Sequence, residues 1–578
     1  MRKNIIKFFG AFLVGIAIFA CKKSFLERLP QASLTEESLA NEKGINATLI
    51  AAYAALDGWN QGGENNASGV AWPTAGSNWI FGSVASDDAY PGSGPNDQAP
   101  IEAINRYQWA TDDPYFRGKY QTIYMGVART NVTLRLLAAS KEDISTEAKD
   151  QITGEAKYLR AHFFFDGYKN FKNIPFIDEN TEDFRQLNDQ DIFPHIEADL
   201  QEAISKLPEK ANNNSGRTNK GAAQALLARA YMFVGKYAEA KPVLQAIIAG
   251  GKYSLSDNFH DNFNAANQNN NEMIFAFKAS VNDGANESAN GNIADRLNAP
   301  HVSPYTECCG FHQPSYNLVN AYKTDANGLP LFATFNNAIY NQNTDFADPR
   351  LDWTVGRIGT PYLDWGPYKI EWIRDPAYGG PYAPKKNVFH AAQKGTLSTA
   401  SGWQTVPNAI DIAFIRYSDV LLMAAECEIE TNDDLELARN YINTVRERAG
   451  KFAQGPGTSE ADLSVALVGG TGSFSYAKYK VGIYPAAGWT QAYAREAVRF
   501  ERRLEFAMEG HRLYDLRRWD TFIPVLNDFV AAEKPRMAAL FAGVQTVDEK
   551  YKWYPIPSTE IQLSSKDGAP QLKQNPGY

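Results

Sequence analysis

The chain of 578 residues carries 57 basic and 66 acidic side chains, a formal net charge of −9, and only four cysteines. This length allows a large core or several domains. An acidic chain without a basic cluster is a poor partner for nucleic acid or for an anionic membrane surface, because both attract concentrated Lys and Arg. Four cysteines are too few for a disulfide framework in a chain of this size, so packing must hold the fold together.

The N-terminus resembles the signal peptide of a bacterial lipoprotein. Arg2, Lys3 and Lys7 precede an apolar run that ends at Ala20, directly before Cys21. The run is too short to span a bilayer, and a cationic start followed by a short apolar segment is typical of a signal that is removed. We expect residues 1–20 to be removed, which moves the net charge from −9 to −12, and Cys21 to be lipidated. The alternative is ordinary secretion with Cys21 unmodified.

Helices are predicted on both sides of the middle of the chain. Apolar residues recur at helical spacing near residues 123–137 and 152–163. The clearest unit, residues 218–251, breaks at Gly235 and has small residues and an aromatic residue where a tetratricopeptide repeat places them. A related pair over residues 421–450 has two more residues between its helices. We therefore predict irregular helix pairs that stack side by side into a scaffold, over about 33–255 and 405–535.

Residues 256–404 differ from this scaffold. They are rich in Asn, Gly, Pro and aromatic residues, with one predicted strand at NEMIFAFKAS (271–280). We predict a loop-rich insertion that binds ligand, because loops on a rigid scaffold can present side chains that the core does not need. Cys308 and Cys309 are adjacent in this insertion and form either a vicinal disulfide or two reduced thiols.

The last predicted helical stretch, residues 490–519, is dense in charge. Acidic and basic side chains nearly balance in it, which favours a structural ion-pair network over a catalytic cluster. The charged residues are Glu501, Arg502, Arg503, Glu505, Glu509, Arg512, Asp515, Arg517 and Arg518.

Several segments carry a family resemblance. They are CKKSFLERLP, NEMIFAFKAS, DPRLDWTVG, IRYSDVLLMAAECE with INTVRERAG, RFERRLEFAMEGHRLYDLRRW and the ending YKWYPIPSTEIQLSSKDGAPQLKQNPGY. In this order, from Cys21 to Tyr578, they resemble the SusD/RagB family of nutrient-binding outer-membrane lipoproteins. The resemblance implies a single, mainly α-helical SusD-like domain over 21–578, with four tetratricopeptide-like helix pairs and few short strands.

The same resemblance implies a function without chemistry or cofactor. Such a protein is lipid-anchored on the extracellular face of the outer membrane of a Gram-negative bacterium. It caps a SusC-like TonB-dependent transporter barrel, captures oligosaccharide or, in some members, peptide, and helps to deliver it to the barrel.

Two loop regions suit a sugar chain, which needs flat apolar faces against its C–H groups and polar groups for its hydroxyls. The first region, residues 71–97, provides Trp72, Asp87, Asp88, Tyr90 and Asn96; the second, residues 301–382, provides Tyr305, Trp365 and Trp372. The alternative is that these rings pin the loops onto the scaffold.

The resemblance adds detail to these candidates. Asp87 and Asp88 stand where the family commonly has an SDE-like stretch, so they either bind sugar hydroxyls or cap a turn. Tyr305 lies in a loop from which the family contributes aromatic contacts, but this loop lacks the Trp of a starch-binding arrangement. A bridged Cys308–Cys309 pair would present an apolar face to a sugar.

Other functional classes are less well supported. A glycosidase needs two carboxylates about 5–9.5 Å apart, and sequence spacing places no such pair. A tetratricopeptide adaptor for proteins alone would not need the aromatic insertion. The seven histidines are scattered without HExxH or CxxC spacing, and a structural calcium ion at the Asp- and Asn-containing loop 341–352 has no further support in the sequence.

Overall fold

The computed structural model describes residues 36–58, 70–210, 216–285, 290–400, 406–454, 457–459, 466–468 and 477–578. The predicted signal segment, the lipidation site Cys21 and the predicted scaffold start at 33 lie outside these ranges. Within them, none of the helices combines the length and apolar character that a bilayer crossing demands.

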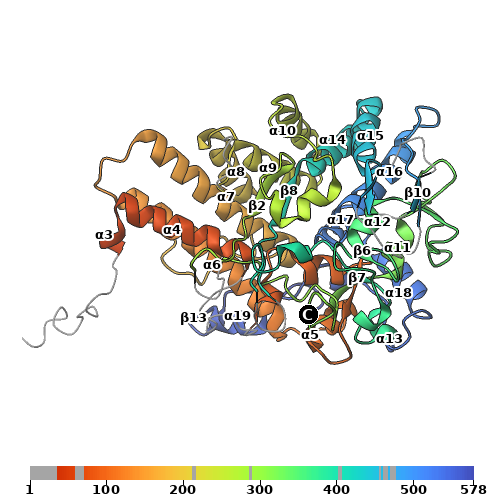
Figure 1. The fold of residues 1–578 in the computed structure, drawn as a ribbon. Helices are drawn as coiled ribbons and strands as arrows, with labels where there is room; N and C mark the ends of the chain where they lie inside the picture. The colour runs from red at the N-terminus through yellow and green to blue at the C-terminus, as the bar shows by residue number, and fades with distance from the viewer. Residues whose placement is uncertain are drawn as a thin grey trace, which may run out of the picture.

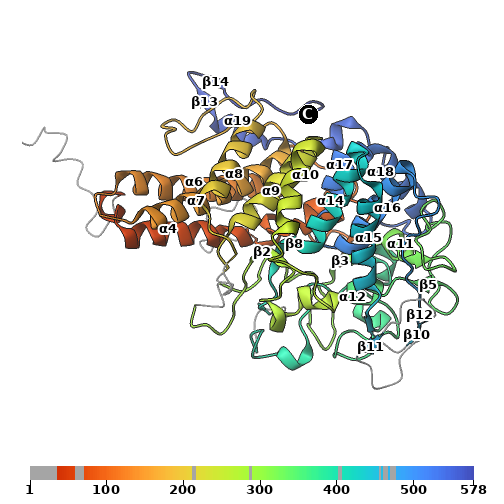
Figure 2. The ribbon, with the colours of Figure 1, turned by 90° about the horizontal axis from the view of Figure 1, so that it is seen from above.

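The first half of the chain is a row of helices that run side by side (Figures 1 and 2). Several begin at a side chain that accepts a hydrogen bond from a first-turn amide: Asn41, Asp113, Ser145 and Asn219. The helices of the row are α3 (Glu36–Leu39), α4 (Glu42–Ala54), α6 (Pro114–Ala139), α7 (Thr146–Phe171), α8 (Phe193–Lys206), α9 (Lys220–Phe233) and α10 (Tyr237–Ala249).

Both predicted tetratricopeptide-like pairs are confirmed. Gly235 joins α9 to α10 at a φ of 78°, and Ala230 and Ala240 are fully buried where the two helices meet. Helix α10 then packs against α14 (Tyr417–Thr431), which pairs with α15 (Leu435–Ala449). The extra residues of this second pair form a left-handed turn at Asn432 and the N-cap Asp434.

The loop-rich region leaves and re-enters the helical row through two neighbouring strands. The predicted strand at 271–280 is β2 (Met273–Phe277), which pairs antiparallel with β8 (Ile412–Arg416). The described residues between them contain only short elements: β3 (Phe311–Pro314), α11 (Tyr316–Ala321), β4 (Lys323–Thr324), β5 (Phe346–Ala347), α12 (Arg350–Thr354), β6 (Val355–Gly356), η7 (Ile370–Trp372), α13 (Pro376–Gly379), β7 (Ala383–Pro384) and η8 (Ala391–Gln393), with η4 (Phe259–Phe263) and η5 (Ala265–Asn267) just before β2.

A second set of short elements lies before α6 and completes the same side of the molecule. It consists of η1 (Ala55–Asp57), η2 (Trp72–Thr74), the π-helix η3 (Trp79–Val84), β1 (Ala89–Gly92) and α5 (Ala99–Asn105). Strand β1 pairs antiparallel with β3, with Gly92 opposite Phe311. This pairing joins the first predicted loop region to the second.

The predicted helix over 490–519 is two helices, α16 (Gln491–Phe506) and α17 (Arg512–Arg518). The chain turns between them at Met508 and Gly510, both with positive φ. A Cβ on Gly510 would lie 2.0 Å from the carbonyl oxygen of Ser77, so only glycine permits this close approach. The single helix predicted over 490–519 is therefore interrupted at this turn.

The remaining elements lie mostly near the C-terminus, and several short strands pair outside the helical row. They are α18 (Phe522–Glu533), η9 (Glu549–Lys552), α19 (Ser558–Leu563), and the hairpin β13 (Ser565–Lys566) with β14 (Ala569–Pro570). Strands β10 (Gly457–Ser459), β12 (Ala477–Tyr479), β5 and β4 form one sheet, β9 (Phe452–Gln454) pairs with β11 (Ala466–Val468), and β6 pairs with β7.

The predicted ion-pair network lies in the interior. It extends beyond helix α16 to residues of several other elements. Glu505 accepts hydrogen bonds from Arg350 and Arg416 at 2.9 Å each and pairs with Arg448. The network contains five cations, Arg350, Lys386, Arg416, Arg446 and Arg448, and five carboxylates, Glu272, Asp348, Glu501, Glu505 and Glu509. Among the charged residues of 490–519 that were predicted to form ion pairs, Arg517 differs: it donates to the Lys169 carbonyl and packs on the Tyr554 ring.

Replacing Glu505 with Gln should destabilise the protein by about 3–5 kcal/mol, because buried arginines would lose their shared carboxylate. Burial alone would raise the pKa of Glu505, but the arginines hold this pKa well below its usual range. The loss should therefore be full at neutral pH and shrink as pH falls below about 4. Urea unfolding midpoints at several pH values measure it. Glu496→Gln, an exposed change on the same helix, should leave the midpoint nearly unchanged; equal midpoints for the two variants would contradict the prediction.

Candidate functional site

A cavity of about 320 Å³ opens between the first and second predicted loop regions. Its buried lining is apolar, and its accessible lining is polar apart from Cys308. The buried residues are Trp72, Leu297, Cys309 and Phe311; the exposed or half-buried residues are Asp97, Gln98, His301, Glu307, Cys308 and Arg374.

The pairing of β1 with β3 brings these residues together. Because the strands are antiparallel, the residues that follow Gly92 lie beside those that precede Phe311. A Cβ on Gly92 would lie 2.3 Å from the carbonyl oxygen of Gly310, so glycine is required where the two segments cross. Residues 93–98 and 301–310 thus form facing walls of the cavity.

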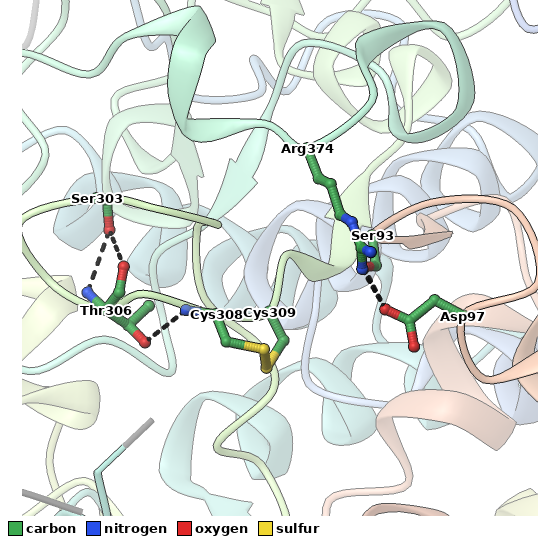
Figure 3. Close-up of a disulfide and its surroundings, with 7 residues drawn as sticks. All are labelled: Ser93, Asp97, Ser303, Thr306, Cys308, Cys309 and Arg374. Carbon is green, nitrogen blue, oxygen red and sulfur yellow. Dashed lines mark hydrogen bonds and ion pairs between the residues drawn. A yellow bond between two sulfur atoms is a disulfide. The ribbon is translucent and has the colours of Figure 1, made fainter. Parts of the chain in front are cut away.

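The structure joins Cys308 to Cys309 in a disulfide that lines the cavity (Figure 3). Ser303 and Thr306 form a turn on one side of it, in which the Thr306 amide donates to the Ser303 hydroxyl at 3.3 Å. The Cys308 amide then donates to the Thr306 hydroxyl at 3.2 Å. These bonds hold the half-buried Cys308 sulfur at the cavity wall, where it adds an apolar surface.

On the other side of the disulfide, Arg374 pairs with Asp97 at 2.5 Å (Figure 3). Ser93 donates to the same Asp97 oxygen at 2.8 Å and accepts from Arg374 at 2.9 Å. Nearby, the Trp72 indole N–H donates to Tyr115 at 2.9 Å and to Gln98 at 3.1 Å. The polar groups of this wall are therefore held in place before any ligand arrives.

The imidazole of His301 faces a mixed electrostatic environment. Burial lowers the pKa of His301, the Arg374 cation lowers it further, and Asp97 opposes both. Its backbone amide donates to the Trp372 carbonyl at 2.8 Å, which ties the cavity to the core of the insertion. His301 is therefore mostly neutral at pH 7 and can both donate and accept hydrogen bonds.

Asp87 and Asp88 do not reach this cavity. Both are buried, and their carboxylates pair with arginines of the C-terminal region: Asp87 with Arg503 at 3.1 Å and Arg512 at 2.8 Å, and Asp88 with Arg503 at 3.1 Å. Burial would raise the pKa of Asp87, but the two arginines hold it at about 2, whereas burial raises the pKa of Asp88. Their interpretation as ligand-binding residues is corrected to a structural one, because the fold itself occupies their oxygens.

Most other predicted aromatic residues pack inside the protein. Tyr90 is fully buried and donates to Glu533; Tyr305 is buried against Trp365 and Phe389. Trp372 is buried against Tyr362 and Tyr368. All three rings pin loops, as the alternative interpretation held: Tyr305 and Trp372 pack in a core that the insertion builds of its own, and Tyr90 packs in a separate cluster with residues of α18 and the segment after it.

Two predicted residues remain accessible outside the cavity lining. Trp365 is half-buried, with its indole N–H donating to the Phe389 carbonyl at 2.8 Å, and Asn96 is exposed next to Asp97. Of the predicted ligand-binding residues, only Trp72 lines the cavity, together with the cysteine pair.

Most of the cavity lining is not singled out by the sequence. Six of its ten residues have no predicted role, and Asp97 is known from the sequence only as a polar residue of the first loop region; the six are Gln98, Leu297, His301, Glu307, Phe311 and Arg374. The adjacent cysteines were the one local signal in the insertion. Residues near them in sequence, His301, Glu307 and Phe311, could have been chosen on that signal, but Arg374 could not.

The described residues form no cluster of the kind that binds a metal ion. Across the described ranges, no three His, Cys, Asp or Glu side chains gather closely enough to hold an ion. In the loop 341–352, for which calcium had no further support in the sequence, Asp348 pairs with Arg350 at 2.7 Å and Asp352 with Arg357 at 2.6 Å, so arginines contact those carboxylates.

Models of known protein families match most of this chain. A model described as the SusD family matches residues 271–578, more than half of the chain. The chain belongs to the SusD family. A second model, described as starch-binding associating with outer membrane, matches residues 24–232.

Individual SusD-like proteins are similar to this chain over most of its length, in sequence or in structure. The SusD-like protein P25 of Formosa agariphila is 26% identical over 562 residues, 91% of each chain, and a SusD-like protein of Bacteroides ovatus is 22% identical over 536 residues, 88% of this chain and 82% of the relative. A solved laminarin-binding SusD-like protein superposes with a TM-score of 0.66 at 23% identity, covering 93% of this chain and 100% of its own. Surface glycan-binding protein A of Bacteroides thetaiotaomicron, solved with laminarihexaose, gives 0.66 at 19% identity, covering 92% and 99%.

Replacing Arg374 with Gln should raise the pKa of His301 toward its ordinary value. The change removes a cation that disfavours imidazolium and frees Asp97, whose charge favours it. A titration of the histidine ring signals by NMR, with His301→Gln to assign the resonance, measures the shift. A pKa that stays in place or falls would contradict the electrostatics described for this wall.

Proposed function

We propose that this SusD-family protein captures a glycan chain at the cavity beside the Cys308–Cys309 disulfide. The observation that carries the proposal is the division of the cavity lining into a buried apolar part and an accessible polar part. A sugar ring has the same two characters, since its C–H groups form an apolar face and its hydroxyls lie at its edge.

The size of the cavity supports a short section of a chain as the ligand. Its volume of about 320 Å³ lies at the low end of the range for small-molecule pockets, about 300–1,000 Å³. Glu307 and Arg374 of its lining are exposed, so the cavity is open to solvent and a longer chain can extend out of it. Glycan binding by the two solved relatives named above points in the same direction.

The place of this capture in the cell is part of the proposal. A SusD-family chain with a lipoprotein-type signal would stand on the outer face of the outer membrane, tethered through Cys21. There it would hand its ligand to a SusC-like TonB-dependent transporter. The family description that mentions association with the outer membrane supports this location.

We propose binding without chemistry. Of the two carboxylates that line the cavity, Asp97 is held by both Arg374 and Ser93, which leaves Glu307 as the exposed one. A glycosidase needs two carboxylates placed across the bond that it cleaves. Incubation of the protein with a bound oligosaccharide should leave the length of the oligosaccharide unchanged.

Calorimetric titration of residues 22–578, which keep every described element, against soluble glucans, fructans and mannans tests the proposal. One class should bind, and Trp72→Ala should weaken its binding at least tenfold, or about 1.4 kcal/mol, because the ring is a buried part of the cavity and orients Gln98. Glu307→Gln should weaken it less, because only one accessible group changes.

Two matched variants serve as controls. Trp365→Ala alters an aromatic residue of the second loop region outside the cavity, and Glu447→Gln alters an exposed glutamate on α15; both should bind as the unchanged protein does. Equal losses in Trp72→Ala and Trp365→Ala would place the site elsewhere. If the protein bound peptides and none of the glycans, the proposed ligand class would be wrong and peptide would take its place.

A further inference from the structure

A larger groove lies along α6, on a side of the helical row separate from the cavity. Its volume is about 670 Å³, and it is lined by α6, by residues 175–186 and by residues 560–572. Two large apolar side chains at its edges are unusually accessible, Phe184 at 69% and Leu563 at 57%. Both side chains line the groove, and exposed large apolar side chains gathered at one groove mark it as a surface for an occupant.

Several polar groups of the groove already have partners in the protein. Arg117 and Gln121 both donate to Glu560, at 2.8 and 3.1 Å. Asn131 donates to the Ile177 carbonyl at 3.0 Å, and Arg185 pairs with Asp183 at 2.9 Å. The groove thus offers apolar contact surface rather than hydrogen bonds, which suits apolar side chains better than sugar hydroxyls.

One face of α6 connects this groove to the start of the described chain. Five groove residues follow each other at steps of three or four along the helix: Arg117, Gln121, Tyr124, Ala128 and Asn131. This spacing places them in one stripe. The next residue of the stripe, Arg135, pairs at 2.9 Å with Glu36, the first described residue. The chain therefore enters the described fold at one end of the groove stripe.

The preceding sequence has the composition and the length to fill the groove. Residues 22–35 lie outside the described ranges and contain Phe25, Leu26 and Leu29 in KKSFLERLPQASLT. From Arg135 to Arg117 the stripe is about 27 Å long, at 1.5 Å per residue. The eleven residue steps from Glu36 back to Phe25 can extend to about 36 Å at roughly 3.3 Å each. The segment can thus reach any part of the groove.

We propose that residues 24–29 bind in the α6 groove, with Phe25, Leu26 and Leu29 against its apolar lining. After removal of residues 1–20, this segment begins three residues after Cys21 and binds to the folded part of the protein. A lipid on Cys21 would then be held close to the groove, so that the groove side of α6 would face the membrane. The docking itself does not depend on lipidation or on glycan binding.

Cysteine cross-linking tests the proposal in residues 22–578. We compare Leu26→Cys combined with Ala128→Cys against Leu26→Cys combined with Ile50→Cys. Ala128 is exposed on the groove stripe, about 10 Å along α6 from Arg135, whereas Ile50 is 56% exposed on α4, about 12 Å from the start of that helix. Both positions lie within the roughly 33 Å that the ten residue steps from Glu36 back to Leu26 can span, but only the first lies in the groove.

Under mild oxidation, most of the Ala128→Cys variant should form the cross-link, identified by peptide mass mapping, and the Ile50→Cys variant should form at least tenfold less. Equal cross-linking to both positions, or a preference for Ile50→Cys, would overturn the proposal.

A second measurement needs no new cysteine. In Phe25→Ser combined with Leu29→Ser, hydrogen exchange should rise at 175–187 and 560–572 relative to the unchanged protein, while exchange in α14 and α15 stays the same. An unchanged thermal unfolding profile of the helical row confirms that the variant is folded. Unaltered exchange in the two groove segments would show that something other than residues 24–29 covers them.

Discussion

The buried ion-pair network around Glu505 is the constraint on which the other parts of the fold depend. Its five cations and five carboxylates come from β8, α12, α15, α16 and the segments before β2, before α12, after β7 and after α16, so the network joins helices α15 and α16 to the loop-rich insertion. A buried charge without a partner costs several kcal/mol, so each element must occupy its own place for all charges to be matched. The network thereby specifies how the insertion sits on the scaffold.

The same electrostatics extend to the cavity. Arg503 on α16 and Arg512 on α17 hold the carboxylates of Asp87 and Asp88, which stand immediately before β1. Ser315, directly after β3, donates from its amide to the Asp88 carbonyl at 2.9 Å. The strand pair that brings the cavity walls together is therefore fastened to the charged C-terminal helices. The two aspartates thus support the walls of the cavity by fixing β1, without lining the cavity themselves.

The sequence allowed prediction of those parts of the fold whose cause is local. Helical periodicity, the Gly235 break and the balanced charges of residues 490–519 each act within one element, and the structure has the helix pairs and the network that they indicate. The break at Gly510 was missed because it serves contact with Ser77, far away in the chain. Loop composition could not separate binding rings from packing rings, since Tyr305 and Trp372 serve the insertion's own core. Arg374 reaches Asp97 across 277 residues, a contact that no local pattern encodes.

The cavity and the α6 groove differ in how their polar groups are used, and this difference separates their occupants. In the cavity, Gln98 and Arg374 use part of their hydrogen-bonding capacity on protein partners, but both stay accessible, with Glu307, around an apolar lining. A ligand can therefore exchange water for hydrogen bonds with their remaining donors and acceptors. In the groove, Glu560 already accepts from two neighbours and Asn131 donates to a backbone carbonyl, so an incoming hydroxyl would have to break existing bonds. An apolar side chain loses nothing by that pairing and gains burial against Phe184 and Leu563. Sugar capture and tether docking are therefore suited to different sites on one molecule, each by the state of its hydrogen bonds.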